Sequence, residues 1–239
     1  MQTQTYYSLP AVNTANPPQE VKIAPILTPG INVSKHDSPI DWDVMAAAGI
    51  KFAFIGTHTC DILARGRLRL VTDPYAVQNL QECAAASIEP CAYQLIDYTG
   101  KGLTPSYQFA LADQVIRKSK VRVKTLALDY EQKNGKYPAL PKRITCLETI
   151  RSWMMPARKA GYELVFYTNH ATLKYLAPIP AWLKTSFELW LAWPDTQAPA
   201  PVQSRYLQYT WNGESEKYGC KGSKTCDLDW RIDYEVGNG

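Results

Sequence analysis

Two carboxylates stand one residue apart at the end of a short apolar run. The run 125–128 leads to Asp129 and Glu131, and the turn signal Asn134-Gly135 follows, so this stretch predicts a buried strand that ends at a surface. Residues i and i+2 of a strand share a face, which places the Cα atoms of the two acids about 6.6 Å apart at roughly 3.3 Å per residue. Close like charges favour the protonated form of one acid, which suits general acid/base chemistry. The alternative is an acidic strand end that is only hydrated.

The elements that must position these acids alternate along the chain. Short apolar strands are predicted at 31–34, 51–56, 91–96, 125–129, 163–168 and 187–193, with two further candidates at 206–209 and 226–230. Helices are predicted between the first five strands, at 42–48 before a Gly49 stop, at 74–87, at 106–119 and at 144–154, the last disturbed at Pro156. The pattern predicts an α/β fold: an irregular TIM-like (β/α) barrel of about eight strands, with few helices on the later strands.

Residues able to bind or to carry charge recur near the predicted strand ends. In barrels of this kind the chemistry lies at the C-terminal ends of the strands. The residues near those ends are Asn32, Asp129, Glu131, Thr168, Trp193, Tyr209 and Asp227. Their convergence favours a functional interpretation of the acid pair over a merely hydrated strand end.

Composition narrows the function classes. The chain has 239 residues, a net charge of +4 and scattered basic residues, so no nucleic-acid stripe is expected. There is no apolar run long enough to cross a membrane, and the N-terminus lacks the features of a signal peptide. Six cysteines match no zinc motif, and neither a metal nor a cofactor is expected. Cys220 and Cys226 flank a short loop that a disulfide could close; free thiols are the alternative.

The domain organisation predicted from composition is a flexible N-terminal arm followed by one barrel. Residues 1–27 are rich in Gln, Thr, Asn and Pro with little periodicity, which is typical of an arm or linker. Residues 28–239 hold all the predicted strands and therefore form the barrel.

Several short stretches, in this order along the chain, resemble glycoside hydrolase family 25, the Chalaropsis-type muramidases. The opening 30–36 and the segments 40–42 and 48–55 resemble the start of the family, and Leu128-Asp129-Tyr130-Glu131 matches its D-x-E signature. Later matching stretches are 167–168, 189–193, 208–209 and 226–229. The resemblance covers the chain from about Gly30 to Asp233.

The resemblance implies cleavage of the β-1,4 bond between N-acetylmuramic acid and N-acetylglucosamine in bacterial peptidoglycan. It implies that Glu131 is the general acid, that Asp129 stabilises the cationic transition state or the reacting N-acetyl group, and that Asp227 completes the acidic site. The substrate-binding positions expected beside them are Asn32, Tyr93, Tyr167, Trp193 and Tyr209.

Departures from the family pattern leave a second function open. The family usually has aspartate where this chain has Asn32, and the stretches 57–60 and 93–95 also differ. An amide can donate and accept hydrogen bonds but carries no charge. The alternative function is a catalytically weakened domain that binds glycan or serves as a structural part of a phage tail. If the enzyme is active, restoring the charge with Asn32→Asp is expected to raise activity.

The setting expected for this chain is a phage lysin or a virion-associated lysozyme, because neither requires export by its own signal peptide. The arm would then contact phage structural proteins, while the barrel acts on peptidoglycan. The cellular location stays open.

Overall fold

The structure is a computed structural model that describes residues 25–63, 67–100, 102–132, 137–194, 200 and 202–234. Most of the predicted arm, residues 1–24, lies outside the described residues. Residues 25–27, which the sequence assigns to the arm, form the start of the first strand.

Nine strands and six helices follow one another in these ranges. They are β1 (Pro25–Val33), α1 (Trp42–Ala47), β2 (Phe52–Leu63), β3 (Arg67–Thr72), α2 (Ala76–Ala85), β4 (Glu89–Leu95), α3 (Pro105–Ser119), β5 (Thr125–Asp129), α4 (Arg143–Lys159), β6 (Glu163–Asn169), α5 (His170–Leu176), α6 (Ala181–Ser186), β7 (Glu188–Ala192), β8 (Tyr206–Glu214) and β9 (Thr225–Tyr234).

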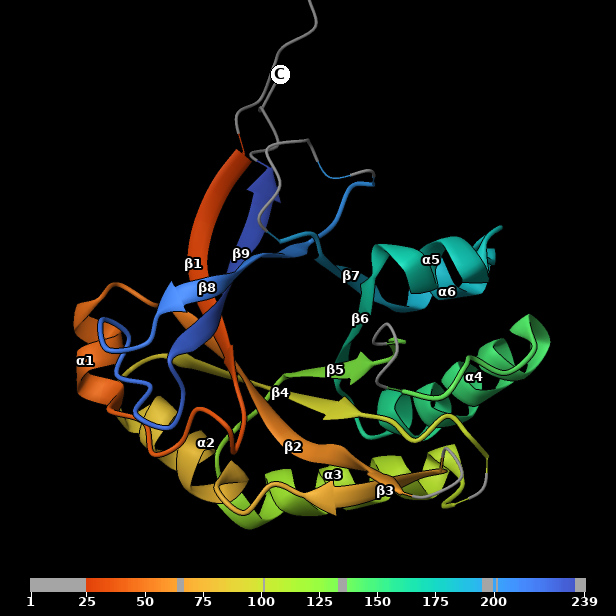
Figure 1. Cartoon of the computed structure of the whole chain (residues 1–239), viewed down its shortest axis with the longest axis horizontal. Helices are drawn as coiled ribbons and strands as arrows, with labels where there is room; N and C mark the ends of the chain where they lie inside the picture. Colours follow the sequence, from red (N-terminus) through yellow and green to blue (C-terminus); the bar gives the residue numbers. More distant parts are fainter. Residues whose placement is uncertain are drawn as a thin grey trace, which may run out of the picture.

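Eight of the strands close into a barrel (Figure 1). The ring runs β1-β9-β8-β7-β6-β5-β4-β2, and the pairing of β1 with β2 closes it. Within this ring β9 is antiparallel to both of its neighbours, β8 and β1. All the other neighbouring pairs of the ring are parallel. Helices α2 and α3 pack on β2 and β4, and α4 packs on β6. The predicted irregular barrel of about eight strands with few later helices is confirmed.

The interior of the barrel is filled by side chains, mostly aromatic. Alternate residues of a strand face opposite sides, so Phe52 and Phe54 point inward while Ala53 and Ile55 face the helices. The ring of Phe54 stacks on Trp190 with 4.0 Å between centroids. Gly30 completes this packing, because a Cβ there would collide with the ring of Phe52. The barrel is therefore a packed scaffold whose chemistry must lie at a rim.

Three features differ from the sequence prediction. Strand β2 continues to Leu63 and folds back as β3, a hairpin whose charged residues hid it from a search for apolar runs. Helices α5 and α6 were not predicted, because they have only seven and six residues. Helix α4 runs through Pro156 to Lys159. The carbonyl that Pro156 cannot pair belongs to exposed Ser152, where water can reach it.

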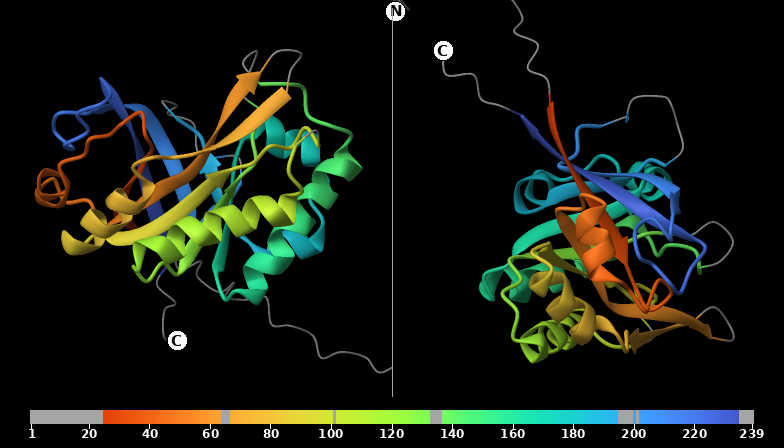
Figure 2. Two further views of the ribbon diagram at one scale, coloured as in Figure 1. Left: turned by 90° about the horizontal axis from the view of Figure 1, so that it is seen from below. Right: turned by 90° about the vertical axis from the view of Figure 1, so that its left-hand side faces the viewer.

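The two ends of the described chain lie side by side. Pro25 at the start of β1 pairs with Tyr234 near the end of β9. Figure 2 shows both strands projecting together beyond the rest of the barrel. The described helices include none with the length and apolar character needed to cross a membrane.

Candidate active site

Carboxyl groups gather at one end of the barrel, from two strands that are far apart in sequence. Ala127 of β5 faces the barrel interior, so Asp129 and Glu131, two and four residues further, continue on that face. Both are buried, at 6% and 5% exposure. Strand β9 contributes Asp227 and Asp229 by the same alternation. These four residues are called the carboxyl cluster below.

Tyr167 of β6 lies at the centre of the carboxyl cluster. It is the neighbour of Asp129 across the β5–β6 pairing. Burial raises the pKa of Tyr167 well above its ordinary value, and further increases come from the negative charges of the cluster, Glu131, Asp129, Asp227 and Asp229. The cluster therefore surrounds one phenol, and Glu131 and Asp227 lie at the same end of the barrel, as the sequence predicts.

Gln208 of β8 connects the two sides of the carboxyl cluster. The hydroxyl of Tyr167 donates to its Oε1 across 2.8 Å, and its Nε2 donates to Oδ2 of Asp227 across 3.1 Å. Gln208 is almost fully buried; its bond to Tyr167 is buried as well, whereas its bond to Asp227 is only partly buried. Because Oε1 of Gln208 accepts from Tyr167, the NH₂ group of the same amide is the part that faces Asp227 and donates to it. Gln208 thereby fixes the position of the Asp227 carboxyl.

Glu131 is held by the residue that begins helix α5. Asn169 donates from Nδ2 to Oε2 of Glu131 across 3.2 Å and to the carbonyl of Gln132 across 2.9 Å. Its Oδ1 accepts the backbone N–H of Thr172 across 2.9 Å and caps α5. That cap fixes which side of the amide faces Glu131. The bond to Oε2 leaves Oε1 as the carboxyl oxygen that Asn169 does not hold.

Asn32 lies beside the carboxyl cluster, at the end of β1. It pairs with Asp227 across the antiparallel β1–β9 register. Its Nδ2 donates to Oδ2 of Asp229 across 3.0 Å. The structure thus brings together Asn32, Asp129, Glu131, Asp227 and Tyr167 of the predicted site.

Comparison with known proteins identifies the class of this arrangement. The family model described as glycosyl hydrolases family 25 matches residues 31–218, more than half of the chain. The chain belongs to glycosyl hydrolase family 25. Membership confirms the predicted class, a glycoside hydrolase of the lysozyme type that acts on peptidoglycan. A comparison with curated proteins finds no match.

Solved structures share the fold at low sequence identity. The bacterial lysozyme of Streptomyces coelicolor is 18% identical with a TM-score of 0.63, over 89% of this chain and 92% of that one. A family 25 glycosyl hydrolase of Bacillus anthracis is 20% identical with a TM-score of 0.66, over 88% and 89%. The catalytic domain of the endolysin ply40, from bacteriophage P40 of Listeria monocytogenes, is 15% identical with a TM-score of 0.62, over 85% and 92%.

Two predicted aromatic positions of this family 25 chain lie near the same end of the barrel. Tyr93 is on β4, its ring packs edge-on against Trp190, and burial followed by the charge of Asp129 raises its pKa. Trp193 follows β7 directly and packs edge-on against His170, with 5.1 Å between ring centroids. Tyr93 is therefore next to the carboxyl cluster, and Trp193 is at the rim beside α5.

Tyr209 is not brought to the carboxyl cluster, which corrects the sequence prediction. Its ring stacks on Trp230 at 4.9 Å between centroids, and it packs against the core between the sheet and the helices. A register shift after Gln208 turns the chain, so that Trp211 donates from its indole to Oε1 of Gln208 across 2.9 Å. Trp211 is 50% exposed. It is the exposed aromatic residue of β8 beside Gln208.

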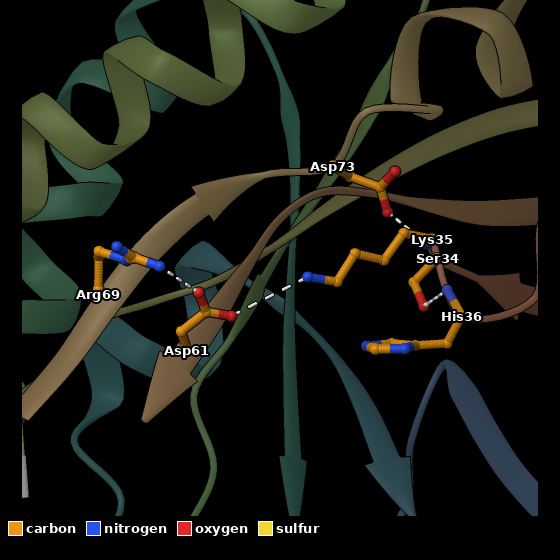
Figure 3. A network of polar contacts seen from close by, with 6 residues as sticks. All are labelled: Ser34, Lys35, His36, Asp61, Arg69 and Asp73. Carbon is orange, nitrogen blue, oxygen red and sulfur yellow. Dashed lines mark hydrogen bonds and ion pairs between the residues drawn. The ribbon is translucent and has the colours of Figure 1, made fainter. Parts of the chain in front are cut away.

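A polar network ties the end of β1 to the β2–β3 hairpin (Figure 3). The ammonium of Lys35 lies 4.0 Å from Asp61, which also pairs with Arg69 at 2.7 Å. The backbone N–H of Lys35 donates to Asp73. Both cations of this network therefore have a carboxylate partner, and the network braces the rim beside Asn32.

Neighbouring histidines on this side do not enter the carboxyl cluster. His36 is exposed next to Lys35. His58 is buried on β2 with its Nε2 3.2 Å from the hydroxyl of Thr72, and burial lowers its pKa to about 4. A neutral His58 packs as part of the hairpin.

A large groove of the described surface lies away from the carboxyl cluster. It has a volume of about 1220 Å³ and its lining comes mainly from β6, α5, α6, β7 and the start of β8. Glu163, Lys174 and Leu183 are among its residues, and the predicted catalytic residues are not.

No group of three His, Cys, Asp or Glu side chains within the described ranges is arranged to hold a metal ion.

Three residues that organise the site were missed from the sequence. Asn169 had a usable signal, because Asn between the end of a strand and the start of a helix is a preferred N-cap residue. Gln208 and Asp229 lie in the stretches 208–209 and 226–229 that resemble the family, but no role was assigned to them, because an amide and an acid in an alternating strand are usually assigned to a hydrated face.

Proposed function

We propose that this family 25 chain is an N-acetylmuramidase that cleaves the β-1,4 bond between N-acetylmuramic acid and N-acetylglucosamine. The observation that carries the proposal is the geometry of Glu131. Its carboxyl is buried, is oriented by Asn169 at one oxygen, and lies in one carboxyl cluster with Asp129 and Asp227. An acid in such a position can protonate the oxygen of the bond that breaks.

The other carboxyls have distinct roles in this proposal. Glycoside cleavage passes through a transition state with positive charge on the sugar ring. Asp129, one residue away from Glu131 on the same face, is the group proposed to stabilise that charge or the reacting N-acetyl group. Asp227, which Gln208 holds at 3.1 Å, completes the acidic surface from the opposite strand. A preorganised carboxylate in a partly dehydrated site stabilises a cation more strongly than one in water.

The test is digestion of purified peptidoglycan, followed by borohydride reduction and mass spectrometry of the fragments. A muramidase leaves N-acetylmuramic acid at the new reducing end. Glu131→Gln keeps the shape of the side chain but has no proton to give, so hydrolysis should fall by about 10²–10⁴-fold with binding retained. Glu148→Gln is the matched control, because Glu148 is exposed on α4. New reducing ends of N-acetylglucosamine would refute the proposed bond.

A glycan-binding function without catalysis is the second candidate. The neutral side chain of Asn32 beside the carboxyl cluster supports it, since the family usually has a charged aspartate at that position. A pull-down on the same peptidoglycan separates the two candidates. Retention of the wild-type protein on peptidoglycan without any fragment release supports the binding function.

The proposal extends to the setting, a phage lysin or a virion-associated lysozyme. One similar structure is the catalytic domain of a phage endolysin, and the polar, proline-containing composition of residues 1–27 suits an arm that docks elsewhere. The proposed partners of the arm are phage structural proteins. Co-sedimentation with purified virions, with and without residues 1–24, tests this setting, because loss of the arm should abolish co-sedimentation and leave hydrolysis unchanged.

A further inference from the structure

The hydrogen bond between Asn32 and Asp229 crosses the β1–β9 pairing on a diagonal. Asp227 is directly opposite Asn32 in the register, and Asp229 is opposite Gly30. Asn32 reaches back across this diagonal to Asp229, with Nδ2 3.0 Å from Oδ2. The two residues come from strands 197 positions apart in sequence.

Asp229 is fully buried and accepts at both carboxyl oxygens. Oδ2 accepts from Asn32, and Oδ1 accepts from the indole N–H of Trp190 across 2.8 Å. Trp190 is itself fixed by stacking on Phe54 in the barrel interior. Both donors are neutral N–H groups. Burial raises the pKa of Asp229 well above its ordinary value; the two hydrogen bonds oppose that increase, and the charge of Asp227 adds to it.

This arrangement fixes the orientation of the Asn32 amide. When Asp229 is ionised its oxygens are acceptors only, so Oδ2 accepts from Nδ2 of Asn32 and would repel the amide oxygen. Oδ1 of Asn32 therefore lies on the side of the amide away from this bond. Because Asp229 holds the Asn32 amide through this bond, its role toward Asn32 is one of positioning.

We propose that Asn32 and Asp229 form one exchangeable amide–carboxylate pair, in which Asp229 sets the orientation of the Asn32 amide for glycan cleavage. The inference rests on the proposed function. It changes the expectation for Asn32→Asp, because a second carboxylate would meet Asp229 across about 3 Å and the donor would be lost. Two carboxylates at that distance cannot both ionise. The single substitution should therefore lower activity.

The opposite single substitution disturbs the same pair differently. In Asp229→Asn, the new amide keeps the bond to Trp190 only with its oxygen, so its NH₂ group faces Asn32. The amide of Asn32 must then rotate and present its donor to the carboxyl cluster. The double substitution Asn32→Asp/Asp229→Asn restores both hydrogen bonds. The bond from Trp190 keeps its direction, and the bond between positions 32 and 229 is reversed, since the amide at position 229 can donate to the carboxylate at position 32.

The experiment compares wild type, the two single variants and the double variant in kcat, KM and melting temperature on purified peptidoglycan. Each single variant should lower kcat at least tenfold, and the double variant should return to within about threefold of wild type. Asp43→Asn is the matched control, because Asp43 is exposed on α1, and it should leave kcat unchanged. A double variant about 100-fold below wild type, the product of two independent tenfold losses, would overturn the pairing.

Two further readouts keep the inference testable apart from hydrolysis. In a ¹⁵N-labelled sample, the chemical shifts of the Asn32 NH₂ protons should change with pH as Asp229 ionises. This change should vanish in Asp229→Asn. If a single variant fails to fold, recovery of folding in the double variant supports the pair, and failure of all three refutes it. A wild-type protein with no hydrolysis refutes the proposed function alone, while the melting temperatures and the NH₂ titration still decide the pairing.

Discussion

Asn169 donates a hydrogen bond to Glu131 across 3.2 Å while its oxygen caps helix α5. One amide thus links the start of a helix to the proposed general acid. The two functions use different atoms of the same side chain, so they can be separated by substitution.

Asn169→Asp is expected to keep the helix cap and lose the donor toward Glu131. Aspartate caps helices about as well as asparagine, but it also places a second carboxylate about 3.2 Å from that of Glu131, so kcat should fall about tenfold or more and the melting temperature should fall as well. Asn169→Ala removes both functions and should in addition cost about 1 kcal/mol of the free energy of unfolding. Kinetics on peptidoglycan and urea unfolding measure the two effects. Equal kcat in wild type and Asn169→Asp would show that the bond to Glu131 has no catalytic role.

Trp211 and Tyr209 should respond in opposite ways to removal. Trp211 is half exposed beside Gln208, so Trp211→Ala should raise KM several-fold and change the free energy of unfolding by only about 0.5 kcal/mol. Tyr209 stacks on Trp230 in the core, so Tyr209→Ala should destabilise the fold by about 2 kcal/mol with KM nearly unchanged. If Tyr209→Ala raised KM and left stability intact, the placement of these two rings would be wrong.

Asp229 makes the stability of the protein depend on pH in a defined direction. Burial raises its folded pKa, while the unfolded chain releases the same proton near about pH 4. Its contribution is therefore fully present below about pH 4 and is lost as the pH rises through the folded pKa. Asp227 faces it as a charged group, and Asn32 and Trp190 face it as neutral donors.

Urea unfolding of wild type and Asp229→Asn between pH 3.5 and 8 measures this dependence. The wild-type free energy of unfolding minus that of the variant should decrease as the pH rises. Asp227 is present in both proteins, so its own titration largely cancels. A difference that stays constant or increases with pH would contradict the burial of an uncompensated carboxyl at position 229.

All six cysteines are buried free thiols. Burial raises the pKa of Cys83 and Cys91 above its ordinary value, which keeps these thiols protonated and unreactive. A colorimetric thiol reagent at pH 8 should therefore label the native protein slowly and count six thiols in guanidinium chloride. A count of four in protein prepared without reductant would indicate the Cys220–Cys226 disulfide that the sequence leaves open.

The sequence alone determined the barrel and the rim at which the acid pair lies. Hydrophobic periodicity is local, so strands such as 125–129 and helices such as 106–119 could be predicted within a few residues. The D-x-E spacing placed Asp129 and Glu131 on one face, because the two-residue period of a strand fixes side-chain direction. Asp227 was predicted from its place near a strand end, and Tyr167 from the resemblance to family 25.

Only the tertiary structure decided which polar side chains hold these groups. Asn169, Gln208 and Asp229 act through hydrogen bonds to residues 38, 19 and 197 positions away, and such contacts have no local signature. In β8 the register shifts after Gln208. Tyr209 packs against the core and Trp211 lies at the site, an arrangement that an unbroken alternation could not predict. The meaning of Asn32 changed for the same reason: its neutral amide matches the buried carboxyl of Asp229, a partner that strand pairing brings next to it and sequence distance conceals.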